Sequence, residues 1–122
     1  MKKILFIEDE SALQKTLGDI LESKGYLMIS ALDGEIGLAL AEKEKPDLIL
    51  LDIILPKVNG MEVLSKLKNN PQTKAIPIII LTNLESINNV GKALELGAMT
   101  YLVKAQYSLG EILEKIEKAL RG

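Results

Sequence analysis

Acidic side chains follow two short apolar segments of the chain. Glu8 and Asp9 come directly after the first segment, and Asp52 comes directly after the third. Carboxylates that are brought together repel one another, which raises the pKa of at least one of them unless a cation intervenes. Because the chain has no histidine or cysteine, an oxygen-only site would favour a hard ion, Mg²⁺ or Mn²⁺. Glu10 fits a solvated acid in the first turn of a helix better than a ligand.

A threonine and a lysine, Thr82 and Lys104, stand at the ends of the last two apolar segments. The lysine could neutralise one carboxylate and later bind an anion. A metal ion and an ammonium group around one carboxylate suit phosphoryl transfer, which depends mainly on positioning and charge stabilisation. That carboxylate would be the nucleophile, and the product would be an aspartyl phosphate.

The composition is that of an ordinary globular domain. The 122 residues are 48% hydrophobic and 26% charged, with a net charge of −2, so one domain over residues 1–122 is expected. The missing histidine and cysteine exclude a Ser-His-Asp triad, a histidine general base and a disulfide framework. The net charge gives no reason to expect nucleic acid as a partner.

No apolar run approaches the roughly 18 residues of a membrane span, and the N-terminal run is too short for a signal peptide. The expectation is a cytoplasmic protein without membrane contact.

Five mostly aliphatic segments are predicted to be strands: residues 4–7, 26–31, 48–51, 76–81 and 101–103. Most are continuous rather than alternating, which is typical of strands covered on both faces in a parallel sheet. The segments between them have helical periodicity, as in the stripe of Leu13, Leu17 and Leu21. Strand and helix alternate five times, which predicts an α/β fold with helices on both faces of a parallel sheet. Ligands of such folds bind beyond the carboxyl ends of the strands.

Helix boundaries are predicted from capping residues. Three pairs have the spacing of a capping box, in which two side chains reciprocally satisfy free backbone amides: Ser11 with Gln14, Asn59 with Glu62, and Ser108 with Glu111. Gly25 and Gly97 lie where helices should end, since glycine readily adopts the left-handed conformation there. Three lysines, Lys66, Lys68 and Lys74, are expected to form a solvated face.

Over essentially its whole length the chain resembles the response-regulator receiver domain of two-component signalling. The resemblance rests on six segments in order: ILFIEDE (residues 4–10), DLILLDIILP (47–56), NG (59–60), IILT (79–82), GA (97–98) and YLVK (101–104). Any one of them is weak alone, and their order and spacing make the match specific. The resemblance implies a flavodoxin-like (βα)5 doubly wound parallel sheet with strand order 2-1-3-4-5.

The resemblance also implies roles for the residues at the strand ends. Asp52 would be the phosphoacceptor. Asp9 and Asp52, with the backbone carbonyl of Ile54, would ligate Mg²⁺ (or Mn²⁺) directly, and Glu8 would act largely through water. Lys104 would pair with Asp52 at rest and with the phosphoryl oxygens afterwards.

By the same resemblance, Thr82 and Tyr101 would form a switch. Thr82 would hydrogen-bond the phosphoryl group, and Tyr101 would rotate inward to fill the space that Thr82 leaves. The fourth helix, fifth strand and fifth helix would then bind a downstream protein effector or a second copy of the chain in a phosphorylation-dependent homodimer. The protein would be no enzyme toward external substrates, since it would phosphorylate and dephosphorylate only itself.

The phosphoryl donor would be a sensor histidine kinase or a phosphotransfer protein, because this chain has no histidine of its own. The kinase-facing surface implied by the resemblance comprises Ala12, Gln14, Lys15 and the loop of residues 105–107.

The chain departs from the family pattern at three positions. Ala105 stands where the family usually has a proline preceded by a cis bond; a cis bond to a non-proline residue costs about 2.5–4 kcal/mol, so a trans bond and an altered loop are predicted. Asn83 stands where the family usually has a small residue, which predicts slower phosphotransfer or hydrolysis than in Asn83→Ala. Glu8 replaces a frequent aspartate and suits a water-mediated role.

Structural explanations exist for each of these residues. Asp52 could cap a helix, Glu8 and Asp9 could favour a helix N-terminus through its dipole, and Lys104 could be an exposed strand-end lysine. Likewise, Thr82 could be a β-branched strand residue. Tyr101 could be a half-buried core aromatic with a hydrated hydroxyl.

Three rival functions follow from the same architecture. A flavin- or nucleotide-binding module would need a glycine-rich phosphate loop after the first strand, where this chain has three acids. A Mg²⁺-dependent aspartyl-phosphate phosphatase would need a second aspartate two residues after Asp52, where this chain has Ile54. A degenerate receiver, serving as a constitutive protein–protein module, is the remaining alternative. The intact Asp9, Asp52 and Lys104 argue against it, and Ala105 and Asn83 keep it open.

Overall fold

The computed structural model describes residues 1–83 and 87–121. Strands and helices alternate in the order β1 (Lys3–Ile7), α1 (Ser11–Ser23), β2 (Leu27–Ala31), α2 (Gly34–Glu44), β3 (Leu48–Leu51), α3 (Gly60–Asn69), β4 (Ile78–Thr82), α4 (Ile87–Glu95), β5 (Thr100–Val103), a 3₁₀ turn η1 (Lys104–Gln106) and α5 (Leu109–Arg121). The five strands form one parallel sheet in the order β2-β1-β3-β4-β5. The predicted α/β fold and strand order are therefore confirmed.

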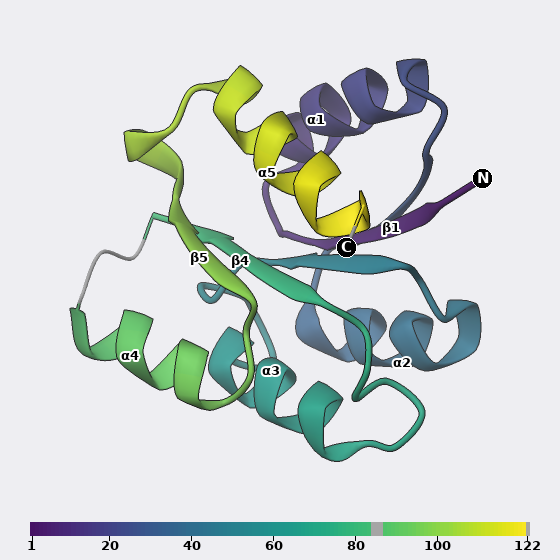
Figure 1. The fold of residues 1–122 in the computed structure, drawn as a ribbon. Helices are drawn as coiled ribbons and strands as arrows, with labels where there is room; N and C mark the ends of the chain where they lie inside the picture. The colour runs from purple at the N-terminus through teal and green to yellow at the C-terminus, as the bar shows by residue number, and fades with distance from the viewer. Residues whose placement is uncertain (84–86, 122) are drawn as a thin grey trace.

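Helices cover both faces of the sheet, with α1 and α5 on one face and α2, α3 and α4 on the other (Figure 1). Each strand supplies alternate side chains to two cores. On β1, Leu5 and Ile7 pack toward α2 and α3, while Ile4 and Phe6 pack toward α1 and α5. All four are fully buried. Burial on both faces accounts for the continuous apolar segments that predicted these strands.

The register of the sheet sets where the chain leaves it. Ile7 on β1 lies opposite both Ala31 on β2 and Leu51 on β3. Glu8 and Asp52, the residues directly after β1 and β3, still hydrogen-bond to the adjacent strands. The Glu8 N–H donates to the Ala31 carbonyl (2.9 Å), and the Asp52 N–H donates to the Ile7 carbonyl (3.0 Å). The acidic residues therefore emerge together at the carboxyl edge of the sheet.

Two predicted helix starts are confirmed in whole or in part. The Ser108 N–H donates to the Glu111 carboxylate (2.9 Å), and the Glu111 N–H donates to the Ser108 hydroxyl (3.1 Å), which is the complete capping box before α5. Asn59 caps α3 by accepting from the Met61 N–H (2.7 Å). Gly25 (φ 94°) and Gly97 (φ 113°) have the left-handed conformation predicted at helix ends.

Three local predictions are wrong. Ser11 is the first residue of α1 rather than its cap, which is Glu10, without a side-chain capping bond. The fourth strand begins at Ile78 rather than at residue 76, because Pro77 has no N–H to give to the sheet. Lys68 is not part of a solvated face, since its ammonium donates to the carbonyls of Lys74 (3.1 Å) and Ile76 (2.8 Å). Burial lowers the pKa of Lys68.

None of the helices in the described ranges combines the length and the apolar character that a bilayer span requires.

Candidate functional site

Three carboxylates meet at the carboxyl edge of the sheet. One oxygen each from Glu8, Asp9 and Asp52 lies within 4.8 Å of the others. Glu8 is 1% exposed and Asp52 is 4% exposed, whereas Asp9 is exposed. The sequence prediction that these three residues would be brought together is therefore confirmed. The reason is the parallel register of β1 and β3, whose ends stand side by side.

Lys104 joins the two buried carboxylates. It follows β5 in the turn η1, and its ammonium contacts Glu8 Oε1 (2.5 Å) and Asp52 Oδ2 (3.1 Å). The predicted pairing of Lys104 with Asp52 is thus present, and the closer contact is with Glu8. Its side chain is only 14% exposed, so the ion pairs are largely shielded from water.

Backbone amides hold the other oxygen of each buried carboxylate. The Glu10 N–H donates to Glu8 Oε2 (3.0 Å), and the Ile54 N–H donates to Asp52 Oδ1 (3.0 Å). Each carboxylate is therefore fixed through one oxygen to its own loop and through the other to Lys104. Within the described part of the chain, the Asp9 side chain makes no hydrogen bond or ion pair, which leaves its oxygens available to a cation.

Burial and the contacts of Lys104 together set the pKa values of the site. It raises the pKa of Glu8 to about 7; the Lys104 and Glu10 hydrogen bonds oppose this rise, and the charge of Asp52 adds to it. Burial lowers the pKa of Lys104, but its hydrogen bonds to Glu8 and Asp52 outweigh that effect, so the pKa is raised overall. Lys104 is therefore an ammonium ion, and one cation faces three acidic side chains.

The donor set fits a divalent cation. Three carboxylates without nitrogen or sulfur ligands favour Mg²⁺, Mn²⁺ or Ca²⁺ over zinc. Because Lys104 alone does not balance the three acidic side chains, a second cation would reduce the repulsion between their carboxylates. The fourth predicted ligand, the backbone carbonyl of Ile54, belongs to the same loop as Asp52, and its own N–H already contacts the Asp52 carboxylate.

Thr82 and Tyr101 lie on neighbouring strands near this edge. Thr82 is fully buried at the end of β4, opposite Val103, the residue before Lys104. Tyr101 is half-buried on β5 and packs against the core between the sheet and α2–α4. Burial raises the pKa of the Tyr101 hydroxyl, and the charge of Asp52 contributes to the same rise. The tyrosine is therefore within electrostatic reach of Asp52.

Gly60 closes the loop that follows Asp52. Its N–H donates to the Ile53 carbonyl (2.9 Å). A Cβ at this position would lie 2.3 Å from Ile53 Cα and 2.5 Å from the Asp52 carbonyl oxygen, closer than real Cβ atoms approach. Sequence reasoning treated Gly60 only as part of a motif; its steric role depends on the return of α3 onto β3, which no local pattern reveals.

Two of the three residues on the predicted kinase-facing helix surface, Ala12 and Lys15, are exposed. Gln14 is not, since it is 6% exposed and its amide donates to backbone carbonyls inside the protein. The prediction for Gln14 is wrong because a polar residue on the inner side of α1 can reach the carboxyl ends of β1 and β2.

The departures at residues 83 and 105 also have defined positions. No peptide bond in the described residues is cis, so the trans Lys104–Ala105 bond is confirmed, and the loop forms the 3₁₀ turn η1. Asn83 follows β4 with an exposed side chain.

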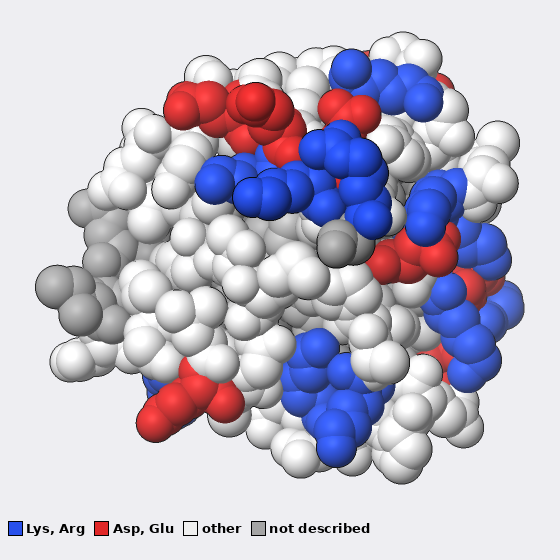
Figure 2. Space-filling view, viewed as in Figure 1, with Lys and Arg blue, Asp and Glu red and all other residues white. Residues whose placement is uncertain are grey.

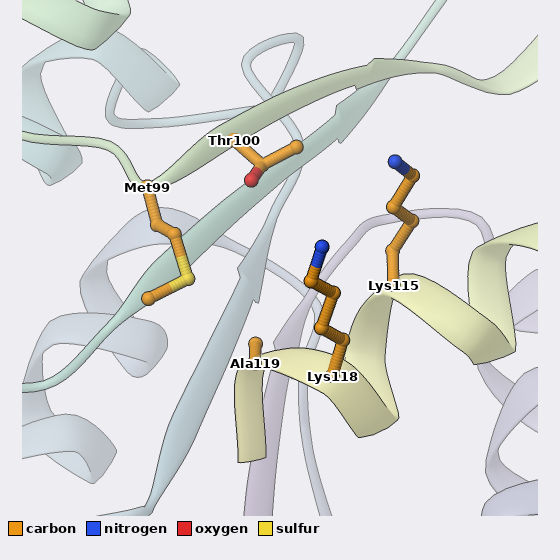
Figure 3. A pocket seen from close by; sticks show the side chains of 5 residues that line it. All are labelled: Met99, Thr100, Lys115, Lys118 and Ala119. Carbon is orange, nitrogen blue, oxygen red and sulfur yellow. The ribbon is translucent and has the colours of Figure 1, made fainter. Parts of the chain in front are cut away.

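A second surface feature lies away from the carboxylates. Lysine and arginine side chains gather over α5 (Figure 2). Between α5 and β5 lies a cavity of about 270 Å³ whose lining includes Met99, Thr100, Lys115, Lys118 and Ala119. Both lysine side chains extend from α5 in the same direction (Figure 3). Met99 is 51% exposed. This part of the surface combines cations with an accessible apolar side chain.

Solved structures of similar fold include two that bear on the site. A CheY-like response regulator receiver domain protein from Methanospirillum hungatei superposes with a TM-score of 0.92 at 33% identity, over 99% of this chain and 94% of that chain. The Mn²⁺-bound form of response regulator Rcp1 superposes with a TM-score of 0.86 at 32% identity, over 97% and 93% of the two chains.

Sequence comparison gives the same relationship. The chain is 42% identical over 120 residues to the alkaline phosphatase synthesis transcriptional regulatory protein PhoP of Bacillus subtilis, a match that covers 98% of this chain and 49% of PhoP. The chain thus spans about half the length of the first curated relatives that it matches. The sequence profile of the response regulator receiver domain matches residues 4–117. With its five-stranded parallel sheet and its acidic pocket, the chain therefore belongs to the response regulator receiver domain family.

Proposed function

We propose that this chain is a phosphoacceptor signalling domain that receives a phosphoryl group on Asp52 from the phosphohistidine of a sensor kinase or phosphotransfer protein. The observation that carries the proposal is the setting of Asp52. Its carboxylate is buried, oriented by the Ile54 N–H and Lys104, and placed beside Glu8 and Asp9.

In the proposed reaction, one oxygen of the Asp52 carboxylate attacks the phosphorus atom. The new O–P bond forms as the N–P bond to the donor imidazole breaks, and the electron pair of that bond stays on the imidazole nitrogen. Lys104, already 3.1 Å from Asp52, would follow the negative charge onto the phosphoryl oxygens. The position of Asp52 between fixed hydrogen-bond donors orients the attacking oxygen, which is the main requirement of phosphoryl transfer.

The proposed metal site comprises Glu8, Asp9, Asp52 and the backbone carbonyl of Ile54, with Mg²⁺ or Mn²⁺ as the ion. The bound ion would neutralise charge on the phosphoryl oxygens. Asp9, exposed and without a protein partner within the described residues, is suited to direct ligation. Glu8 is engaged by Lys104 and Glu10, which suits a role through water.

For the output, we propose that phosphorylation moves Thr82 and Tyr101 and alters the face formed by α4, β5 and α5. The cavity beside Met99, Lys115 and Lys118 belongs to this face. A downstream protein effector would bind there, or a second copy of the chain in a phosphorylation-dependent homodimer. The proposed location is the cytoplasm, and Ala12, Lys15 and residues 105–107 remain the proposed kinase-facing surface.

Activity toward external substrates is not part of the proposal. Ile54 stands where a hydrolase would need an acid or base beside the nucleophile, so the phosphoryl group would be lost only by hydrolysis of the domain's own acyl phosphate. Two alternatives, a degenerate receiver and an aspartyl-phosphate phosphatase, predict different results in the following acetyl phosphate experiment.

The test uses acetyl phosphate and Mg²⁺, followed by a phosphate-affinity gel. We expect a shifted band for the wild type and for the control Asp19→Asn, whose exposed carboxylate lies on α1, and no shift for Asp52→Asn. A wild type that never shifts would contradict the proposal and support the degenerate module. Sustained release of inorganic phosphate from unrelated monoesters would support the phosphatase instead.

A further inference from the structure

Gln14 makes an unusual set of contacts inside the protein. Its side chain is 6% exposed, and its amide nitrogen Nε2 faces three backbone carbonyl oxygens. These belong to Phe6 (2.8 Å), Glu8 (3.1 Å) and Ala31 (3.1 Å). One side-chain amide on α1 therefore joins the end of β1, the start of the acidic turn and the end of β2.

The other end of the same side chain is unsatisfied. Among the described residues, Gln14 Oε1 is a buried side-chain oxygen without a hydrogen-bond partner. A buried acceptor without a partner costs free energy, and each such group requires an explanation. A methionine of similar size would fill this space and bring no unpaired side-chain oxygen, but it would remove the donor to the Glu8 carbonyl. Packing alone therefore does not account for a glutamine at this position.

The hydrogen bonds donated by Gln14 converge on the turn that carries the acids. The Gln14 side chain donates to the Glu8 carbonyl (3.1 Å), and its backbone N–H donates to the Glu10 carbonyl (3.1 Å). The Glu10 N–H in turn donates to the Glu8 carboxylate (3.0 Å). The Glu8 N–H is bonded to the Ala31 carbonyl (2.9 Å), which also accepts from Gln14. Both backbone groups of Glu8 are thus tied to one small network.

We propose that Gln14 is a positioning residue of the metal and phosphorylation site. By holding the Glu8 carbonyl against the ends of β1 and β2, its amide fixes the direction in which residues 8–10 leave the sheet, and so sets the distance from the Glu8 and Asp9 carboxylates to Asp52. The unsatisfied Oε1 is the energetic consequence of placing a donor among three acceptors. This inference rests on the proposed metal site.

The test compares a variant without the donor, a variant with a different donor and a stability control. Gln14→Met keeps the size and removes the donor. Gln14→Lys replaces the amide with an ammonium, which has three donors and no acceptor to leave unpaired. Leu21→Ala truncates a fully buried apolar side chain of α1, which takes no part in the hydrogen bonds of the acidic turn. Mn²⁺ affinity is measured by calorimetry, the exchange of the amides of residues 8–10 by NMR, and stability by the thermal midpoint.

We expect Gln14→Met to weaken Mn²⁺ binding at least about tenfold, as the loss of a group that orients metal ligands typically does, and to speed amide exchange in residues 8–10. Gln14→Lys is expected to keep affinity close to that of the wild type. Leu21→Ala is expected to lower the thermal midpoint and leave the affinity unchanged. Unchanged affinity in Gln14→Met, or a loss of affinity that tracks the midpoint across all variants, would overturn the inference.

Other outcomes keep this inference separate from the proposed function. If Gln14→Met does not fold, a folded Gln14→Lys with weakened Mn²⁺ binding overturns the inference. If the wild type binds Mn²⁺ and the variants behave as expected but Asp52 is never phosphorylated, the role of Gln14 stands and the phosphoacceptor proposal fails. If the wild type binds no Mn²⁺, the inference fails with the metal site.

Discussion

Glu8 is a buried carboxyl group in a chain without histidine, so its titration should be visible in the stability of the whole protein. Burial raises its pKa from the ordinary value of 4.5 to about 7 in the folded state. Between these two pH values the unfolded chain has released the Glu8 proton and the folded chain retains it. The free energy of unfolding of the metal-free protein must therefore fall as the pH rises above about 4.5, and must level off above about pH 7.

The size of this effect follows from the interval between the two pKa values. At about 1.4 kcal/mol per pH unit, the interval from 4.5 to about 7 corresponds to about 3 kcal/mol in all. Part of it is already lost at the acidic end of an accessible range, so the expected decrease from about pH 5 to about pH 8 is about 2–3 kcal/mol. No histidine or cysteine side chain is present to titrate in the same range, and the decrease can therefore be assigned to Glu8.

The assay is urea unfolding followed by far-ultraviolet circular dichroism, in EDTA, at several pH values across this range. Glu8→Gln keeps the shape of the side chain and cannot ionise, so its free energy of unfolding should be nearly independent of pH. The matched control is Glu10→Gln, which changes an exposed neighbour and should retain the pH dependence of the wild type. The reasoning would be refuted by parallel pH profiles for Glu8→Gln and the wild type.

Two further predictions concern residues that shape the site and the helices around it. Gly60→Ala should cost about 3 kcal/mol or more in urea unfolding and slow the acetyl phosphate reaction, because its Cβ would lie 2.3 Å from Ile53 Cα. Gly18→Ala, with nothing within 4 Å of its Cβ, should instead raise the free energy of unfolding by up to about 1 kcal/mol, and equal effects of the two substitutions would contradict the steric argument. Ser108→Ala should lower the free energy of unfolding by about 1 kcal/mol. Because Ser108 and Glu111 form one capping box, Glu111→Ala should lower the free energy of unfolding less in the Ser108→Ala protein than in the wild type. Additive losses would contradict this.

Much of the site could be predicted because it depends on strand ends. In a parallel sheet the residues that follow each strand emerge at one edge, so an apolar segment followed by an acid places Asp9 and Asp52 at the same edge. The strand order implied by the family resemblance, with β1 beside β3, brings the two residues together. The same reasoning placed Lys104 at this edge, and the family resemblance implied its pairing with Asp52, which the 3.1 Å contact confirms. It could not show that Lys104 would contact Glu8 more closely, because that depends on the turn η1 and on the length of two flexible side chains.

Prediction failed where one sequence pattern fits two structures. Ser11 and Gln14 have the spacing of a capping box, yet Gln14 turns inward to three carbonyls and Ser11 lies within α1. Ser108 and Glu111 have the same spacing and do form the box. The difference is the neighbourhood: the start of α1 faces the ends of β1 and β2, whose carbonyls compete for the Gln14 amide, whereas the start of α5 is exposed and the local bonds are the best ones available.

The amino-acid sequence by itself determined the alternation of strands and helices, the parallel sheet and the identity of the acids at its edge, because hydrophobic periodicity is a local property and alternating strands and helices form parallel sheets. Tertiary structure decided the rest: which oxygen of each carboxylate meets Lys104, how far burial raises the pKa of Glu8, why Gly60 admits no side chain, and where the Gln14 amide points. Those features arise from distances between segments far apart in the chain, and such distances are fixed only when the helices pack against the sheet.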